Sequence, residues 1–143
     1  MEGGVHVFPV RVYYEDTDAG GVVYHSNYLR FAERARTELL RHLGFQQSRL
    51  WAEDRIGFVI RRCVADFLAP ARLDDLLLVA SRPTGLRGAS LDLRQNVMRG
   101  GLELVRLQVK LACMSINGRP ATVRDALANF LGNDWSEYGN QRG

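Results

Sequence analysis

A long helical pattern that ends at Leu43 constrains the fold of this chain more than any other feature. Its apolar side chains recur at steps of one, three and four, which places them on one helix face: Tyr28, Leu29, Ala32, Ala35, Leu39, Leu40 and Leu43. The charged side chains fall on the opposite face: Arg30, Glu33, Arg34, Arg36, Glu38 and Arg41. Ser26 or Asn27 is expected to cap the start of the helix, and Gly44 to follow its end. The rest of the chain must therefore supply one apolar surface for this helix to pack against.

Strand patterns surround the helix. One covers residues 5–14 before it, and four follow it, at residues 58–68, 76–82, 89–98 and 102–116. The last alternates most clearly, with one face formed by Val105, Leu107, Val109, Leu111 and Cys113. Turns are predicted at residues 85–88 and 99–101, where glycines interrupt the strand patterns. This order predicts an α+β fold in which one antiparallel sheet packs against one long helix.

The length and composition fit one globular domain. The chain has 143 residues, of which 46% are hydrophobic, so it is long enough to bury a core without a cross-link. We expect the domain to cover residues 1–132, with a small helix near residues 122–131. Residues 133–143 are rich in glycine, asparagine and other polar residues and are expected to form a flexible tail.

The cysteines and the N-terminal residues predict a cytoplasmic protein. Cys63 and Cys113 both lie in apolar strand patterns, which is typical of reduced thiols in a core. Residues 1–10 lack the basic and apolar regions of a signal peptide. No apolar stretch approaches the roughly 20 residues that a membrane-spanning helix needs, so no membrane span is expected.

Several function classes are excluded by what the sequence lacks. The net charge is only +3 and the arginines are scattered, so nucleic acid is not an expected partner. His6, His25 and His42 show no metal-ligand spacing with one another or with the cysteines. There is no Gly-x-Ser-x-Gly motif and no P-loop lysine after Gly20-Gly21. The sequence therefore predicts neither a metal nor a cofactor.

An acid cluster remains as the candidate for chemistry. Glu15, Asp16 and Asp18 stand just before Gly20-Gly21 and the start of the helix. Free backbone N–H groups at a helix start can stabilise developing negative charge, and a neighbouring carboxylate can activate water or attack a carbonyl. Aspartates also form turns and precede helices for purely structural reasons. From chemistry alone, both interpretations of the cluster stay open.

The run Asp18-Ala-Gly-Gly-Val-Val-Tyr-His-Ser-Asn-Tyr28, with the helix after it, resembles the signature of hot-dog-fold acyl-CoA thioesterases of the 4-hydroxybenzoyl-CoA thioesterase-like superfamily. The resemblance is strongest to the YbgC-type, Tol-Pal-associated branch, and the pattern Glu33-Arg-Ala-Arg-Thr-Glu38 continues it. It implies a hot-dog fold, in which one antiparallel five-stranded sheet wraps around a long central helix. The specific motif is confined to residues 13–44, and beyond them only the order of elements matches.

The resemblance also implies roles for residues in this run. Asp18 matches the catalytic carboxylate, as general base or as nucleophile. Backbone N–H groups near Tyr24 and His25, most simply that of His25, would polarise the thioester carbonyl. The His25 imidazole would carry a proton or serve only as a surface residue at the helix start. Gly20, Gly21 and Asn27 are assigned to substrate binding, with Asn27 also a helix cap and Asp16 a turn or helix-supporting residue.

The function expected on this basis is hydrolysis of an acyl-CoA thioester to a free acid and coenzyme A, with a mild preference for short or medium aliphatic acyl groups. A homodimer or homotetramer is implied, with each active site at a subunit boundary, and an acyl carrier protein is a candidate partner. The alternatives are a non-catalytic binder of acyl chains or acyl carrier protein that acts as a scaffold in lipid or envelope machinery, and a hot-dog dehydratase. The position of Asp18 favours the thioesterase.

Overall fold

The computed structural model describes residues 4–44, 48, 51–52 and 55–115. Its elements are β1 (His6–Arg11), the 3₁₀ turn η1 (Tyr14–Asp16), α1 (His25–His42), β2 (Ile56–Phe67), β3 (Leu76–Arg87), β4 (Ser90–Arg99) and β5 (Leu102–Ser115). The small helix expected near residues 122–131 and the tail at 133–143 lie outside the described residues.

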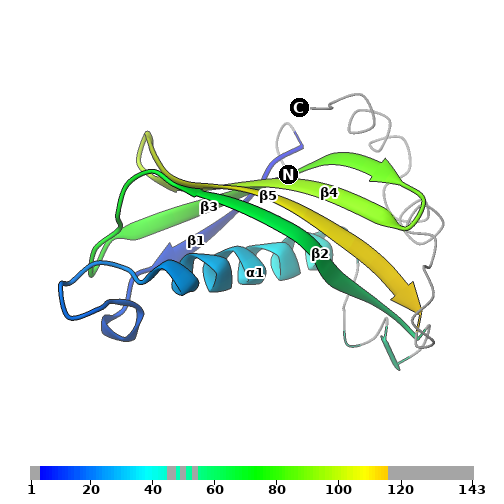
Figure 1. The fold of residues 1–143 in the computed structure, drawn as a ribbon, viewed down its shortest axis with the longest axis horizontal. Helices are drawn as coiled ribbons and strands as arrows, with labels where there is room; N and C mark the ends of the chain where they lie inside the picture. Colours follow the sequence, from blue (N-terminus) through cyan, green and yellow to red (C-terminus); the bar gives the residue numbers. More distant parts are fainter. Residues whose placement is uncertain (1–3, 45–47, 49–50, 53–54, 116–143) are drawn as a thin grey trace.

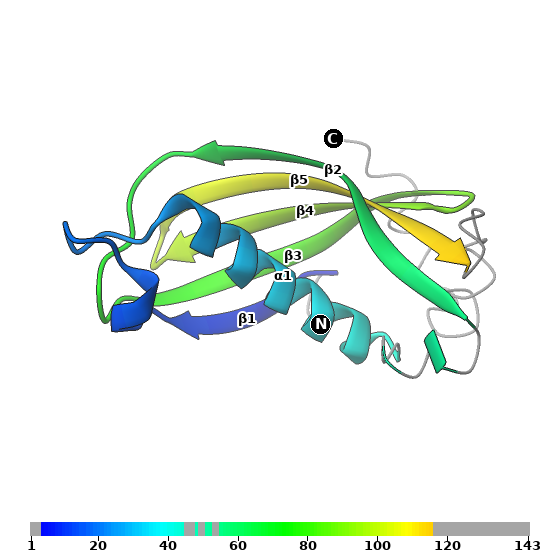
Figure 2. The same ribbon diagram turned by 60° about the horizontal axis from the view of Figure 1, so that its bottom comes forward.

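All five strands form one antiparallel sheet in the order β1-β3-β4-β5-β2. The sheet curves over α1, which lies along one of its faces (Figures 1 and 2). β1 and β2 form the two edges, although they flank α1 in the sequence. The predicted α+β arrangement of one helix on one antiparallel sheet is therefore confirmed.

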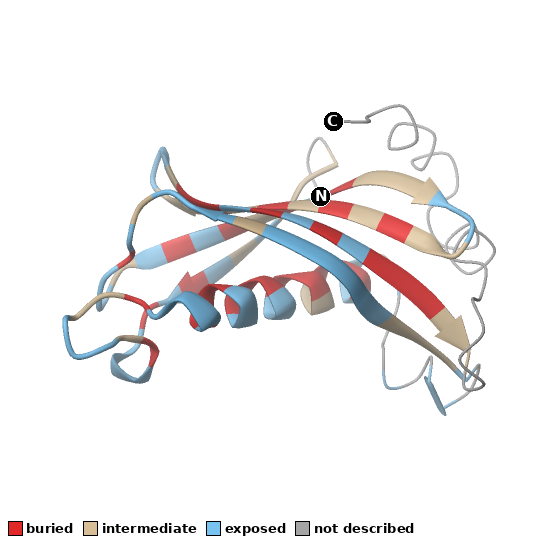
Figure 3. Ribbon diagram, in the orientation of Figure 1, coloured by how far each residue is buried: buried red, intermediate tan, exposed pale blue. Residues whose placement is uncertain are grey.

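The core lies between α1 and the facing side of the sheet, where buried residues alternate along the strands (Figure 3). On β5 the predicted face is buried, from Val105 to Cys113 in steps of two, and β4 buries Leu91, Leu93, Gln95 and Val97. α1 contributes the buried apolar residues Tyr28, Phe31, Ala32, Ala35, Leu39 and Leu40. The period-two and helical patterns thus meet as two faces of a single core.

The helix differs from the prediction at its start and on its faces. It begins at His25, and Tyr24 occupies the N-cap position without a side-chain capping bond, so neither Ser26 nor Asn27 is the cap. Leu29 is exposed, whereas Arg36, predicted to be in water, is only 6% exposed. The end of the helix agrees with the prediction, since Gly44 follows it with φ +97°.

Burying Arg36 requires a polar partner in the sheet. Its Nη1 donates to Oε1 of Gln95 at 2.8 Å, and Gln95 Nε2 donates to the Ala32 carbonyl and to Ser81 Oγ, each at 2.9 Å. Gln95 and Ser81 are fully buried. Because every one of these groups is out of water, the network ties the middle of α1 to β3 and β4.

Three strand predictions also need correction. β1 ends at Arg11, since Tyr14 starts η1 and is exposed. β3 continues through Gly85 to Arg87, so the turn predicted at 85–88 falls only at its far end, at Gly88 and Ala89.

Cys63 is exposed on the edge strand β2, while Cys113 is buried as expected. The glycine turn at residues 99–101 is present, with Gly100 at φ +59°.

Candidate active site

The loop between β1 and α1 is fixed by Asp16. Its carboxylate accepts a hydrogen bond from the Tyr13 N–H at 2.8 Å, and its side chain is buried. The Asp16 carbonyl accepts from the Tyr24 N–H at 3.2 Å and from Asn27 Nδ2 at 2.8 Å. Asn27 is itself 9% exposed. Asp16 and Asn27 therefore hold the acid-containing loop against the first turn of the helix.

Asp18 closes a very short hairpin that leads into α1. Its N–H donates to the Val22 carbonyl at 2.8 Å, and Thr17 forms a β-bridge with Val23. The carboxylate Oδ1 accepts from the Gly20 N–H at 2.8 Å and from the Val22 N–H at 3.3 Å. Asp18 is exposed, and within the described residues its Oδ2 accepts no hydrogen bond. One oxygen is thus held in place while the other faces solvent.

The two glycines of the hairpin are engaged in this geometry. A Cβ on Gly20 would lie 3.2 Å from Asp18 Oδ1, which is a tight contact. Gly21 has φ +79°, a conformation that side-chain-bearing residues seldom adopt. Gly20 therefore lies against the Asp18 carboxylate, while Gly21 provides the left-handed turn and donates its N–H to the Asp18 backbone carbonyl at 3.0 Å.

The first turn of α1 follows the hairpin directly. The Tyr24 N–H is used by Asp16, and the Asn27 N–H donates to the Tyr24 carbonyl at 2.9 Å. The N–H groups of His25 and Ser26 have no acceptor among the described residues. These two amides sit at the positive end of the helix dipole, where negative charge is stabilised.

Aromatic rings surround this helix start. The His25 ring lies 4.8 Å from the Phe67 ring and 6.3 Å from the Tyr24 ring, measured between centroids. The Tyr28 ring lies 5.9 Å from that of Phe67. Tyr24 and Phe67 are 59% and 45% exposed, so they form an apolar margin open to a ligand or a partner. Phe67, at the end of β2, carried no sequence signal for this position.

The loop between β2 and β3 anchors the hairpin from the other side. The Val23 N–H donates to the Ala71 carbonyl at 2.9 Å, and the Ala71 N–H donates to the Tyr28 hydroxyl oxygen at 2.8 Å. Burial raises the pKa of Tyr28, which keeps its hydroxyl protonated. Asp75 pairs with Arg99 at 2.8 Å and steadies the same loop. Tyr28 therefore serves as a rigid support.

The residues predicted for the site lie on two consecutive segments. Asp18, Gly20 and Gly21 are in the hairpin, and Tyr24, His25 and Asn27 are at the helix start that follows it. In the described ranges, no group of three or more His, Cys, Asp or Glu side chains could hold a metal ion. Over the same residues, no helix is long and apolar enough to cross a membrane. The arrangement offers a carboxylate with one open oxygen and a pair of open amides on one short segment.

Comparison with known proteins gives this geometry a context. The sequence model of the thioesterase-like superfamily matches residues 12–131. The chain is 50% identical over 109 residues to "Acyl-CoA thioesterase YbgC" of Haemophilus influenzae, covering 76% of this chain and 80% of that protein. It is also 50% identical over 108 residues to "Acyl-CoA thioester hydrolase YbgC" of Escherichia coli O6:H1, covering 75% and 80%.

A solved structure shares both the fold and part of the sequence. The crystal structure of "Probable Thioesterase from Bartonella henselae" superposes with a TM-score of 0.79 at 38% identity, covering 82% of this chain and 98% of that one. The likeness to that structure therefore covers most of this chain, and the family model includes the hairpin that carries Asp18.

Proposed function

The chain belongs to the thioesterase-like superfamily, in its YbgC-type branch, and we propose that it hydrolyses acyl-CoA thioesters to a free acid and coenzyme A. One observation carries the proposal. The carboxylate of Asp18, with Oδ2 open, lies in a short hairpin that leads directly to the open amides at the start of α1. Release of free thiol from acyl-CoA by the purified protein is the test.

Asp18 would act through its open oxygen. As general base, Oδ2 takes a proton from water while the water oxygen bonds to the thioester carbon. As nucleophile, Oδ2 itself bonds to that carbon, and water later cleaves the resulting anhydride. In both routes the C–S bond breaks, and the coenzyme A thiolate departs and gains a proton. The two amides that hold Oδ1 keep the carboxylate aimed during either step.

The developing oxyanion would be stabilised by the His25 N–H. The Tyr24 N–H is engaged with Asp16, whereas the His25 N–H has no acceptor in the described part of the chain. Tyr24 would then contribute to the site through its exposed ring and as the N-cap residue of α1, and not through its N–H. The exposed His25 imidazole, packed on Phe67, is available to carry the proton to the leaving thiolate.

Gly20, Gly21 and Asn27 would support substrate binding by shaping the site. Gly20 donates to Asp18, Gly21 provides the left-handed turn, and Asn27 donates to the Asp16 carbonyl. Each of these contacts sets where the carboxylate or the helix start lies. A substrate carbonyl placed between the Asp18 carboxylate and the start of α1 would then meet both the carboxylate and the His25 N–H.

The exposed edge of β2 supports a homodimer, which the branch's resemblance also implies. β2 has 12 residues, and Val59, Ile60 and Val64 are each at least 38% exposed along it. A long edge strand with exposed apolar side chains invites pairing with another strand. The opposite edge, β1, has six residues and contains Pro9, which cannot donate to a ladder. We propose that two copies pair through β2, with a tetramer built from such dimers.

Ile60→Lys is expected to convert the dimer into a monomer, because a charge on a pairing edge opposes strand addition. Leu102→Lys is the matched control: Leu102 is 49% exposed, close to the 52% of Ile60, but lies at the start of β5 away from the β2 edge. Sedimentation velocity of both variants measures the result. A wild type that sediments as a monomer would contradict the proposed pairing.

We further propose that the protein works in the cytoplasm and that acyl carrier protein is an additional acyl donor. Burial raises the pKa of Cys113 to about 11, so this thiol stays protonated and unreactive. Cys63 is exposed and unpaired with another cysteine, which fits a reducing compartment.

The net charge of +3 would favour binding of an acidic acyl carrier protein.

A further inference from the structure

The face of the sheet that points away from α1 carries a polar hollow. Its residues alternate with buried ones such as Ser81, Leu93 and Gln95, the last of which bonds to α1. The hollow has a volume of about 320 Å³, and we call it the outer hollow. It is lined by Val5, Ala80, Arg82, Arg94, Asn96, Glu103, Arg106 and Gln108.

The strand register explains its shape. Arg82, Arg94 and Gln108 form one row across β3, β4 and β5, and Ala80, Asn96 and Arg106 form the next row. Polar side chains, all larger than that of alanine, occupy five of these six positions. Ala80 is the exception, so its small side chain leaves open space among its neighbours. The hollow therefore lies where one alanine interrupts a grid of polar residues.

The charges in the outer hollow are unbalanced. Arg82 and Arg94 stand directly opposite each other on adjacent strands, a placement in which like charges repel. The single carboxylate of the hollow, Glu103, pairs with Arg106 at 2.7 Å and accepts from Asn96 Nδ2 at 2.8 Å. Within the described residues, neither Arg82 nor Arg94 has a carboxylate partner.

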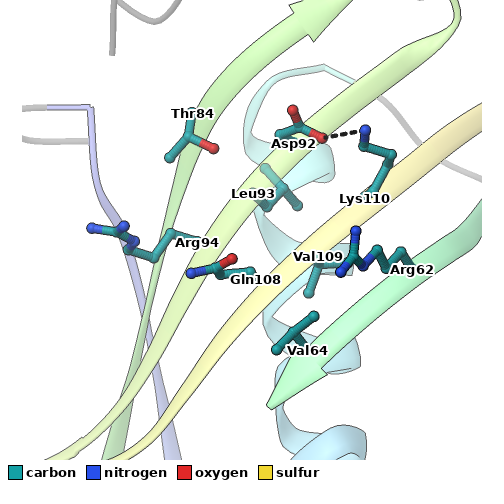
Figure 4. A pocket seen from close by; sticks show the side chains of 9 residues that line it. All are labelled: Arg62, Val64, Thr84, Asp92, Leu93, Arg94, Gln108, Val109 and Lys110. Atoms are coloured by element: carbon teal, nitrogen blue, oxygen red, sulfur yellow. Dashed lines mark ion pairs between the residues drawn. The ribbon is translucent and has the colours of Figure 1, made fainter. Parts of the chain in front are cut away.

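The neighbouring charges do not relieve this repulsion. Asp92, two residues before Arg94 on β4, pairs with Lys110 at 3.9 Å. Figure 4 shows Arg94 extending away from that ion pair, while α1 passes behind the strands. Arg94 is only partly exposed, so its charge is less screened by water than that of a fully exposed side chain.

We propose that the outer hollow binds a phosphate group of a soluble ligand, held by Arg82 and Arg94. Guanidinium groups bind phosphate oxygens through paired N–H donors, and an anion between them would turn their repulsion into attraction. The Gln108 amide lies in the same row and adds a neutral donor. A second copy of this face would bring the same cations together, so self-association through it is disfavoured.

Arg94 and Gln108 of the outer hollow lie in front of the strands in Figure 4, while α1 passes behind them. Asp18, in contrast, precedes the start of α1. The phosphate in the outer hollow can come from two sources: the nucleotide end of coenzyme A, or a separate phosphorylated metabolite. Both present the same chemistry to Arg82 and Arg94. The experiment must therefore separate the binding of phosphate from the binding of substrate.

Calorimetric titration of the full chain with pyrophosphate and with coenzyme A at low ionic strength tests the proposal. Arg94→Gln is expected to weaken pyrophosphate binding by about tenfold, and Arg82→Gln with Arg94→Gln together by more. Arg87→Gln is the control, because it removes the same charge from an exposed position at the end of β3, outside the hollow. It should change the affinity for pyrophosphate by less than about twofold.

A second readout separates the two sources. If the hollow holds the nucleotide phosphates, the double variant raises KM for acyl-CoA but leaves hydrolysis of the matching acyl-pantetheine unchanged. If it holds a separate ligand, pyrophosphate binding is lost while KM for both substrates stays at the wild-type value. The titration measures binding alone, so it remains readable even if the proposed hydrolysis fails.

The proposal is overturned if wild-type protein binds neither pyrophosphate nor coenzyme A, or if the double variant binds both as wild type does. The first result would favour an acidic protein surface, and not a phosphate, as the partner of Arg82 and Arg94. The second would place any phosphate site elsewhere on the chain. A thermal unfolding midpoint equal to that of the wild type shows that each variant is folded.

Discussion

Asp18→Asn is expected to lower kcat/KM for acyl-CoA by about a hundredfold or more, because an amide neither accepts the proton from water nor attacks the carbonyl carbon. The change is nearly isosteric. An asparagine carbonyl oxygen can still accept from the N–H groups of Gly20 and Val22, as Oδ1 does in the wild type. The hairpin should therefore keep its shape while the chemistry is lost.

Glu15→Gln provides the matched control for this result. Glu15 belongs to the same acid cluster and is exposed in η1, so its loss changes the local charge equally. The kcat/KM of the Glu15→Gln variant should stay within about twofold of the wild type, as expected for an exposed, screened charge. Equal losses in both variants would mean that the cluster acts only through its overall charge. No loss in either would make Asp18 a turn residue.

Gln95→Leu is expected to lower the free energy of unfolding by about 3 kcal/mol, the largest stability change that we predict. The substitution removes the acceptor of Arg36, which is 6% exposed, and the donor to the Ala32 carbonyl and Ser81. Arginine stays charged even though burial lowers the pKa of Arg36. The result is a buried cation without a hydrogen-bond partner in the part of the chain that the structure describes.

Gln108→Leu tests whether the loss comes from this network. Gln108→Leu is the same substitution on the same sheet, but Gln108 lies on the outer face and is exposed. Its free energy of unfolding should change by no more than about 0.5 kcal/mol. Urea unfolding of both variants measures the difference. A loss under about 1 kcal/mol for Gln95→Leu would show that water reaches Arg36 in its place.

The sequence predicted those parts of the fold that depend on local periodicity. The helix end at Gly44, the alternation of β5 and the turn at Gly100 all follow from side-chain spacing and glycine conformation. The faces of α1 were predicted less well, because Phe31 and Arg36 lie on its buried side. A guanidinium is normally in water, and only its distant partner Gln95 makes its burial acceptable.

The candidate site shows the same division between local and distant information. Asp18, Gly20 and Gly21 are close in sequence, so the motif indicated that they act together. Phe67 and Ala71 reach the helix start from the far end of β2 and the loop after it, and no local pattern marks them. Likewise, Cys63 was expected in the core, but it lies on a strand with a partner on one side only.

Asp18 also shows why the two interpretations of the acid cluster stayed open from chemistry alone. One of its oxygens closes a turn, as a structural aspartate does, while the other is open to solvent. A turn residue and a catalytic carboxylate therefore need not be different residues. The turn provides the orientation that the chemistry requires.

The most direct test of the central claim is thiol release by the wild-type protein from a panel of acyl-CoAs of increasing chain length, with one aromatic member. We predict that at least one member is hydrolysed with saturable kinetics well above its uncatalysed rate, and that this member identifies the substrate class. Saturable binding of acyl-CoAs with no thiol released from any of them would contradict the account and identify the protein as a non-catalytic binder.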